Sequence, residues 1–188
     1  MIAKHNAFYG YVIALAIVSS LLAKWLVNED VERREAVAHS ADFFSVGYQK
    51  WQMNEQGGLG SHLTANKMAH YSDDGTTELE NPLMFFYNAP NPAWQIQAET
   101  GKLEKSSETL WLNGNVEIER AASSQGRELI IHTENLQVLP KTSFAQTSEF
   151  TELRSGNNIT TGLGMKATFS APVHLELLAK VHGSYDKK

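Results

Sequence analysis

The chain has 188 residues, a formal net charge of −5 at pH 7 and no cysteine. The acidic balance argues against nucleic acid as a partner, because nucleic-acid backbones are bound by basic surfaces. The missing cysteine excludes thiol catalysis, cysteine-type zinc sites and a lipid anchor attached to cysteine.

The N-terminal segment over residues 7–27 is mostly apolar and carries one charged residue, Lys24. A helix of this length, at roughly 1.5 Å per residue, would cross the hydrocarbon core of a bilayer, which is about 30 Å thick. We therefore predict a transmembrane helix over residues 7–27, after a tail over residues 1–6 and before a charged juxtamembrane linker over residues 28–40. The side chains expected to anchor this helix include Ala7, Tyr11, Leu15, Leu22, Trp25 and Val27.

A cleaved signal peptide is the alternative for this segment. The pattern Ala36-Val37-Ala38 resembles a signal-peptidase site, but several charged residues separate it from the apolar run. Such a site normally follows the apolar run closely, which favours a retained anchor. The Lys and Arg residues on the two sides of the segment do not decide its orientation.

Residues 41–188 are predicted to form one all-β domain. Segments such as Trp94–Ala98 and Val116–Glu119 alternate with the period of two that is typical of half-buried strands. Segments rich in glycine or Asp-Gly, such as residues 57–60 and 73–75, indicate tight turns between strands.

Three segments of this domain resemble one another and follow at nearly equal intervals. They are Ala65–His70, Ala98–Leu103 and Thr133–Val138. Each is followed by a second similar element, beginning at Asn81, Gly114 and Glu149 respectively, and a partial further copy covers residues 162–185. Such repeats predict stacked antiparallel hairpins, which would build a β-jelly roll or an open, trough-like barrel around one apolar interior. Chance similarity among hairpins is the alternative.

Apolar residues on one face of these strands would line the interior. On the alternation they are Leu83, Phe85, Trp94, Ile96, Leu110, Leu112, Val116, Ile118, Ile131, Phe144, Phe150, Met165, Phe169, Leu175 and Leu177. A packed sandwich core is the simpler interpretation of such a stripe, and the lining of an open apolar trough is the alternative.

The sequence contains no recognisable catalytic, metal-binding or cofactor-binding motif. Its seven histidines are scattered, and a pair such as His62 and His70 does not have a zinc-ligand spacing. Glu117 and Glu119 share one strand face, which would suit acid–base chemistry, but an outward polar face explains them more simply. We therefore expect no enzyme activity, no catalytic residue, no metal and no cofactor.

Several segments together give the chain a family resemblance. They include Trp94–Leu103, Leu110–Ile118, Gly162–Met165 and the ending Leu177–Tyr185. With the N-terminal apolar helix and the single β-domain, they resemble the LptC family of lipopolysaccharide export proteins. The resemblance implies an OstA-like antiparallel β-jelly roll in the periplasm. It also implies a single-pass helix that holds this domain at the inner membrane of a Gram-negative bacterium, with a cytoplasmic N-terminus.

The resemblance further implies a non-enzymatic function in lipopolysaccharide transport. The domain would accept lipopolysaccharide from the LptB/F/G ABC transporter in its apolar groove and pass it to LptA. The transmembrane helix and the first strand, near residues 41–51, would contact the transporter, and the last strand, near residues 175–185, would pair with LptA. A membrane-anchored scaffolding or adhesion domain with a closed core is the alternative function.

The resemblance also implies roles for individual residues. By position in the family pattern, the residues that would contact lipid in the interior are Tyr48, Leu79, Leu175 and Tyr185. A jelly roll open at both ends leaves two unpaired edge strands, which a partner's strand can extend. The side chains expected on these edges are Phe43, Phe44, Val46, Leu178, Val181 and Tyr185.

Overall fold

The fold is taken from a computed structural model of the chain. The residues that it describes are 12–24, 40–88, 91–104, 108–124 and 126–185. The chain divides into two units, Met1–Ser40 and Ala41–Lys188.

The described part of the first unit is a helix over residues 12–24 with exposed side chains, among them Leu15 and Leu22. Among the described residues, no helix combines the length and the apolar character that crossing a membrane requires. The other predicted anchor residues lie outside the described residues, as do the predicted tail and nearly all of the predicted linker. These anchor residues are Ala7, Tyr11, Trp25 and Val27.

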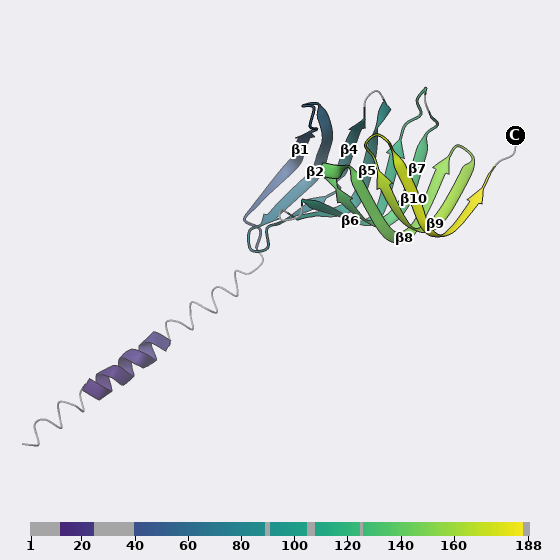
Figure 1. The fold of residues 1–188 in the computed structure, drawn as a ribbon. Coiled ribbons are helices and arrows are strands. Elements are labelled where there is room, and N and C mark those ends of the chain that lie inside the picture. Colours follow the sequence, from purple (N-terminus) through teal and green to yellow (C-terminus); the bar gives the residue numbers. More distant parts are fainter. Residues whose placement is uncertain (1–11, 25–39, 89–90, 105–107, 125, 186–188) are drawn as a thin grey trace, which may run out of the picture. The chain divides into compact units, whose positions relative to one another are not determined.

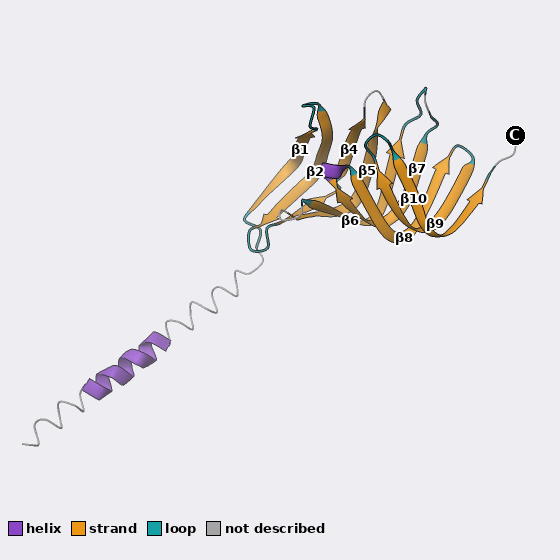
Figure 2. Ribbon diagram, viewed as in Figure 1, coloured by secondary structure: helices purple, strands orange, loops and turns teal. Residues whose placement is uncertain are grey.

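The described part of the second unit is all β, as the sequence predicts, apart from one turn of 3-10 helix, η1 (Pro140–Thr142). Its strands are β1 (Phe43–Met53), β2 (Leu59–Tyr71), β3 (Thr76–Glu80), β4 (Leu83–Asn88), β5 (Asn91–Glu104), β6 (Thr109–Arg120), β7 (Leu129–Leu139), β8 (Phe144–Ser155), β9 (Asn158–Thr168) and β10 (His174–Ser184). They form one antiparallel sheet in the order β1-β2-β3-β5-β6-β7-β8-β9-β10. β4 continues the line of β3, because both strands pair with β2 and with β5. Figures 1 and 2 show how this sheet curls between β1 and β10.

Two tight turns form where the sequence predicts them. Between β1 and β2, the Asn54 side chain accepts hydrogen bonds from the backbone N–H groups of Gln56 at 3.1 Å and Gly58 at 2.8 Å. Between β2 and β3, the Asp74 carboxylate accepts hydrogen bonds from the N–H and the hydroxyl of Thr76, at 2.9 and 2.6 Å. These short polar side chains bind backbone N–H groups at the turns, which helps to fix the register of each hairpin.

Most strands are kinked near the middle, and the kinks form a line across the sheet. At several kinks a residue has a positive φ; these residues are Gly47, Asn81, Gly114, Asn135, Gly164 and Lys180. In β5 and β8 the register shifts instead, between Ala98 and Thr100 and between Thr147 and Phe150. Except for Gly47, the kinks lie within the repeated segments, so each repeat is a hairpin of two kinked strands. Because a bulge bends and twists its strand, the kinks let the sheet curl around its own apolar face.

The kinks also change which residues face the interior. In β5, Trp94 and Ile96 are buried at even-numbered positions. Beyond the register shift, Gly101 and Leu103 occupy the same face at odd-numbered positions, opposite Leu112 and Leu110 of β6. A shift of one residue moves all following side chains to the other face of a strand. One alternating pattern therefore cannot be extended along the whole strand.

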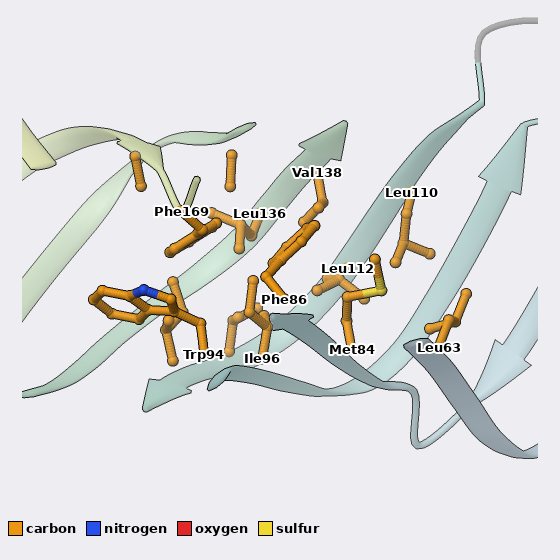
Figure 3. Packing of buried hydrophobic residues seen from close by; sticks show 14 of the residues in the cluster. Leu63, Met84, Phe86, Trp94, Ile96, Leu110, Leu112, Leu136, Val138 and Phe169 are labelled. Atoms are coloured by element: carbon orange, nitrogen blue, oxygen red, sulfur yellow. The ribbon is translucent and has the colours of Figure 1, made fainter. Parts of the chain in front are cut away.

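Buried side chains from β2 to β9 form one continuous apolar core. Figure 3 shows a row of them, with Trp94 and Phe169 toward one end and Leu63 and Leu110 toward the other. Phe169, which follows β9, lies against Phe86 of β4 and Trp94 of β5, with ring centroids 5.3 and 5.1 Å apart. The core thus joins two parts of the curled sheet that are distant in the sequence.

Two residues of β4 that were predicted to face the interior lie on the opposite face. Leu83 and Phe85 alternate with Met84 and Phe86, and the latter pair is buried. The prediction was wrong because the run from Leu83 to Tyr87 is apolar at every position. In such a run the alternation of strand side chains does not show which residues face the interior.

The predictions for Phe144 and Phe150 of β8 were wrong as well. Phe144 precedes the fully buried Ala145 and points away from the core, and Phe150 is 59% exposed. Small side chains occupy the interior face of this strand, including Thr151, whose hydroxyl lies 3.2 Å from that of Thr133. Thr133 donates to the carbonyl oxygen of Phe150 at 3.0 Å. The buried positions are odd-numbered on both sides of the kink between Thr147 and Phe150, so the even-numbered Phe144 and Phe150 both face outward. The buried hydroxyls satisfy backbone groups beside the kink.

Candidate functional site

The aromatic part of the apolar interior is closely packed. The rings of Phe86, Trp94 and Phe169 are each 1% exposed, and they contact one another across the sheet. Interiors packed in this way resist changes of side-chain volume. A ligand that entered this region would have to displace buried side chains.

Partly buried apolar residues border this core near both ends of the sheet. We call this set the rim: Tyr48 on β1, Met68 on β2, and Leu175 and Leu177 on β10. Cross-strand pairing places Tyr48 opposite the buried Ala65, and Leu177 opposite the buried Met165. Burial raises the pKa of the Tyr48 hydroxyl, so this residue is neutral at physiological pH. An apolar chain laid along the rim would gain about 25 cal/mol for each Å² of apolar surface removed from water.

Most of the predicted interior residues are brought together by the fold. Those in the buried core are Leu79, Trp94, Ile96, Leu110, Leu112, Val116, Ile118, Ile131, Met165 and Phe169. Those in the rim are Tyr48, Leu175 and Leu177. The interpretation as a packed core therefore applies to the buried residues of the interior, and the rim carries part of the apolar surface that remains accessible.

Tyr185 follows the last residue of β10 and is 69% exposed. Its ring lies against Gly183, where an added Cβ would come within 2.7 Å of the ring atom Cε2. Gly183 is paired with Thr160, which is paired in turn with Leu153, a residue that packs against the core. The ring therefore lies on the interior side of the sheet, in a place that a side chain at position 183 would make it leave.

The two ends of the sheet have unpaired edges. Within the described residues, β1 pairs only with β2, and β10 pairs only with β9. The predicted edge residues are all exposed, by 47% to 80%: Phe43, Phe44, Val46, Leu178, Val181 and Tyr185. An unpaired edge presents free backbone N–H and C=O groups, and natural proteins usually protect it with charges or proline. Exposed apolar side chains beside such an edge favour the addition of a partner's strand.

Two features of the outer face were missed by reasoning from the sequence. The first is a groove of about 580 Å³ beside Phe44 and Val46. Lys67 and Glu80 also line this groove and form an ion pair, in which Nζ of Lys67 lies 2.9 Å from Oε2 of Glu80. The second is a row of stacked rings, whose neighbouring centroids are 4.9, 5.9 and 6.3 Å apart. Its members are Trp51, His62, Phe85 and Tyr87. Both features depend on strand register, which the sequence alone does not give.

The carboxylates considered for acid–base chemistry lie on the outer face of β6. Glu117 accepts a hydrogen bond from the Gln97 side chain at 2.7 Å, and its other oxygen lies 3.4 Å from Nδ1 of His132. These partners come from the neighbouring strands β5 and β7. The arrangement is that of a cross-strand polar ladder, which stabilises a solvent-facing sheet surface.

The curled sheet, its apolar interior and its two free edges define a β-jelly-roll domain of the LptA-like kind. The fold is similar to the crystal structure of LptH from Pseudomonas aeruginosa, described as the LptA-homologous periplasmic component of its lipopolysaccharide transport device. That similarity has a TM-score of 0.51 and 8% identity, and it covers 68% of this chain and 95% of that one. At this identity, the similarity establishes the fold.

The sequence itself matches the family described as "Lipopolysaccharide-assembly, LptC-related" over residues 11–186, and the chain belongs to this family. No curated protein sequence matches the chain significantly. Family and fold together assign the chain to lipopolysaccharide transport, and the resemblance seen in the sequence is confirmed.

Proposed function

We propose that this chain is a non-enzymatic carrier that accepts lipopolysaccharide from the LptB/F/G transporter and passes it to LptA. The observation that carries the proposal is one curled sheet whose apolar interior is only partly covered beside its two free edges. Lipid enters beside one edge, lies along the rim, and leaves beside the other. The family membership supports lipopolysaccharide as the lipid that is carried.

The energetics explain why such a carrier needs an apolar surface. Exposing an acyl chain of about a dozen carbons to water costs roughly 10 kcal/mol, at about 0.8 kcal/mol per CH₂ group. Rim residues such as Leu175 and Leu177 offer apolar surface without the loss of core packing. Because the rim is also partly open to water, the lipid is held loosely enough to leave.

The free edges supply the contacts with neighbouring proteins. Strand addition at an edge forms a ladder of backbone hydrogen bonds, which is largely independent of side-chain identity. We propose that β1, with Phe44 and Val46 exposed, pairs with the transporter, and that β10, with Val181 exposed, pairs with LptA. The apolar N-terminal segment over residues 7–27 would hold the domain at the inner membrane beside its supplier.

Site-specific photo-crosslinking tests the proposal in cells that make lipopolysaccharide. A photoreactive amino acid at Leu177, in the rim, should yield an adduct with lipopolysaccharide. The same amino acid at Phe150, which is exposed on the outer face, should yield none. Equal adducts at both positions, or no adduct at Leu177 in a folded protein, would favour a closed-core scaffolding domain instead.

A further inference from the structure

Arg120 is the last residue of β6, and it lies on the interior side of the sheet. Its cross-strand partners are Trp94 of β5 and Leu129 of β7. Trp94 is buried in the core, and Leu129 packs against that core. The other interior residues of β6 are apolar and buried: Leu110, Leu112, Val116 and Ile118. A permanent positive charge therefore stands at the end of an otherwise apolar face.

The aromatic core holds the guanidinium in place. Its carbon atom lies 4.9 Å from the centre of the Trp94 ring, which is within the range of a cation–π interaction. One nitrogen also donates to the backbone carbonyl of Arg127, at a long 3.4 Å. Among the described residues, no carboxylate forms an ion pair with Arg120. The charge is thus oriented without being neutralised.

A small polar cavity of about 140 Å³ adjoins this group. Its lining residues are Asn91, Pro92, Arg120, Ser123 and Gly126. A guanidinium presents five N–H donors in a planar fork, which matches the oxygens of a phosphate group. Arg120 lies between this polar cavity and the apolar core, as the phosphate-bearing headgroup of an amphiphile lies beside its acyl chains.

We propose that Arg120 binds a phosphate group on the headgroup of the transported lipid, while the acyl chains lie along the rim. This inference rests on the proposed function and adds to it a fixed orientation of the ligand. The headgroup is held at the Trp94 end of the core, shown in Figure 3. Arg120 then selects phosphorylated amphiphiles over neutral lipids of the same chain length.

The test measures binding of two probes to the full chain in detergent by titration calorimetry. One probe is lipid A with both phosphates, and the other is lipid A from which they have been removed. Arg120→Gln should weaken binding of the phosphorylated probe about tenfold, or about 1.4 kcal/mol, and leave the other unchanged. Arg154→Gln is the matched control, because Arg154 is already paired with Glu152, with Nε and Oε1 2.6 Å apart; it should change neither.

Other outcomes separate this inference from the function on which it rests. If wild-type protein binds neither probe, the carrier function itself fails. If Arg120→Gln weakens both probes equally, or neither, Arg120 does not recognise phosphate, although transport can stand. Inorganic phosphate that competes fully at the concentration of the lipid would identify a free-phosphate site and overturn the inference. Arg120→Lys, which keeps the charge and most of the stem, should retain part of the selectivity if Arg120→Gln does not fold.

Discussion

Phe86 and Phe169 stack across the interior, with ring centroids 5.3 Å apart and ring planes inclined by 15°. One ring comes from β4 and the other follows β9, so this contact closes the curled sheet on itself. Both rings also lie next to Trp94, which pairs with Phe86 and contacts Phe169. The stability of the domain and the shape of its interior therefore depend on the same side chains.

Phe169→Ala should destabilise the β-domain by about 3–5 kcal/mol, because it opens a cavity among fully buried rings. Phe150→Ala removes the same atoms from an exposed position and should change stability by less than about 0.5 kcal/mol. Denaturant unfolding of the two variants measures this difference. Similar losses in both would contradict the assignment of Phe150 to the outer face.

Leu177→Asp and Leu178→Asp place the same charge on opposite faces of β10. Leu177 packs against the core and belongs to the rim, whereas Leu178 is 47% exposed. We expect Leu177→Asp to lower lipid A affinity by roughly tenfold or more, because a carboxylate is poorly tolerated beside an acyl chain. Leu178→Asp should leave the affinity nearly unchanged. Calorimetric titration measures the lipid A affinity of both variants, and circular dichroism checks that they are folded. Equal affinities would show that the rim is not the lipid-binding surface.

Val181→Lys tests the free edge of β10. Charged side chains protect edges from strand addition, so this variant should weaken association with LptA by about tenfold without unfolding the domain. Phe150→Lys adds the same charge to an exposed position on β8, a strand that is paired on both sides, and should have little effect. Pull-down at matched concentrations measures the association. Unchanged binding of Val181→Lys would mean that LptA does not use this edge.

The stability of the structure at the start of β1 depends on pH through the carboxylate of Asp42. Hydrogen bonds from the side chain and the backbone N–H of Ser72 lower the pKa of Asp42 below its ordinary value of 3.8. A carboxylate with a lowered folded-state pKa adds stability that is present above the unfolded value and is lost as pH falls through the folded value. The Ser72 amide resonance should therefore titrate with a midpoint below 3.8, and Asp42→Asn should abolish this transition. A midpoint at or above 3.8 would show that the hydrogen bonds do not favour the charged form.

The sequence predicted the all-β domain and its hairpin repeats because these follow from local signals. Asn54 and the Asp73-Asp74-Gly75 run carry their own turn chemistry, and the repeated segments share one pattern of kinks. Interior residues such as Trp94 and Ile96 were also predictable, since they lie in strand segments that alternate regularly.

The remaining features depend on information that is not local. Which residues of the apolar run Leu83–Tyr87 face the interior is decided only by the pairing of this run with β2 and β5. In β8 the small residues Ala145 and Thr151 occupy the interior face, so the large Phe150 faces outward. The division of the interior into a packed core and an accessible rim depends on which strands lie at the edges. No local signal in the sequence distinguishes Arg120, and only the strand register places it beside Trp94.

The line of kinks across the sheet has a consequence for how the chain tolerates changes in length. Each strand needs a fixed number of residues between its kink and its end. Removing one of these residues would turn the apolar side chains of that strand toward water, while the apolar side chains of the neighbouring strands would still face the interior. Gly114 and Asn135, on adjacent strands, mark such points. Insertions and deletions are therefore expected only in the turns at the strand ends, such as the one around Asn54. The line of kinks thus fixes the length of each half-strand, and with it the width of the sheet.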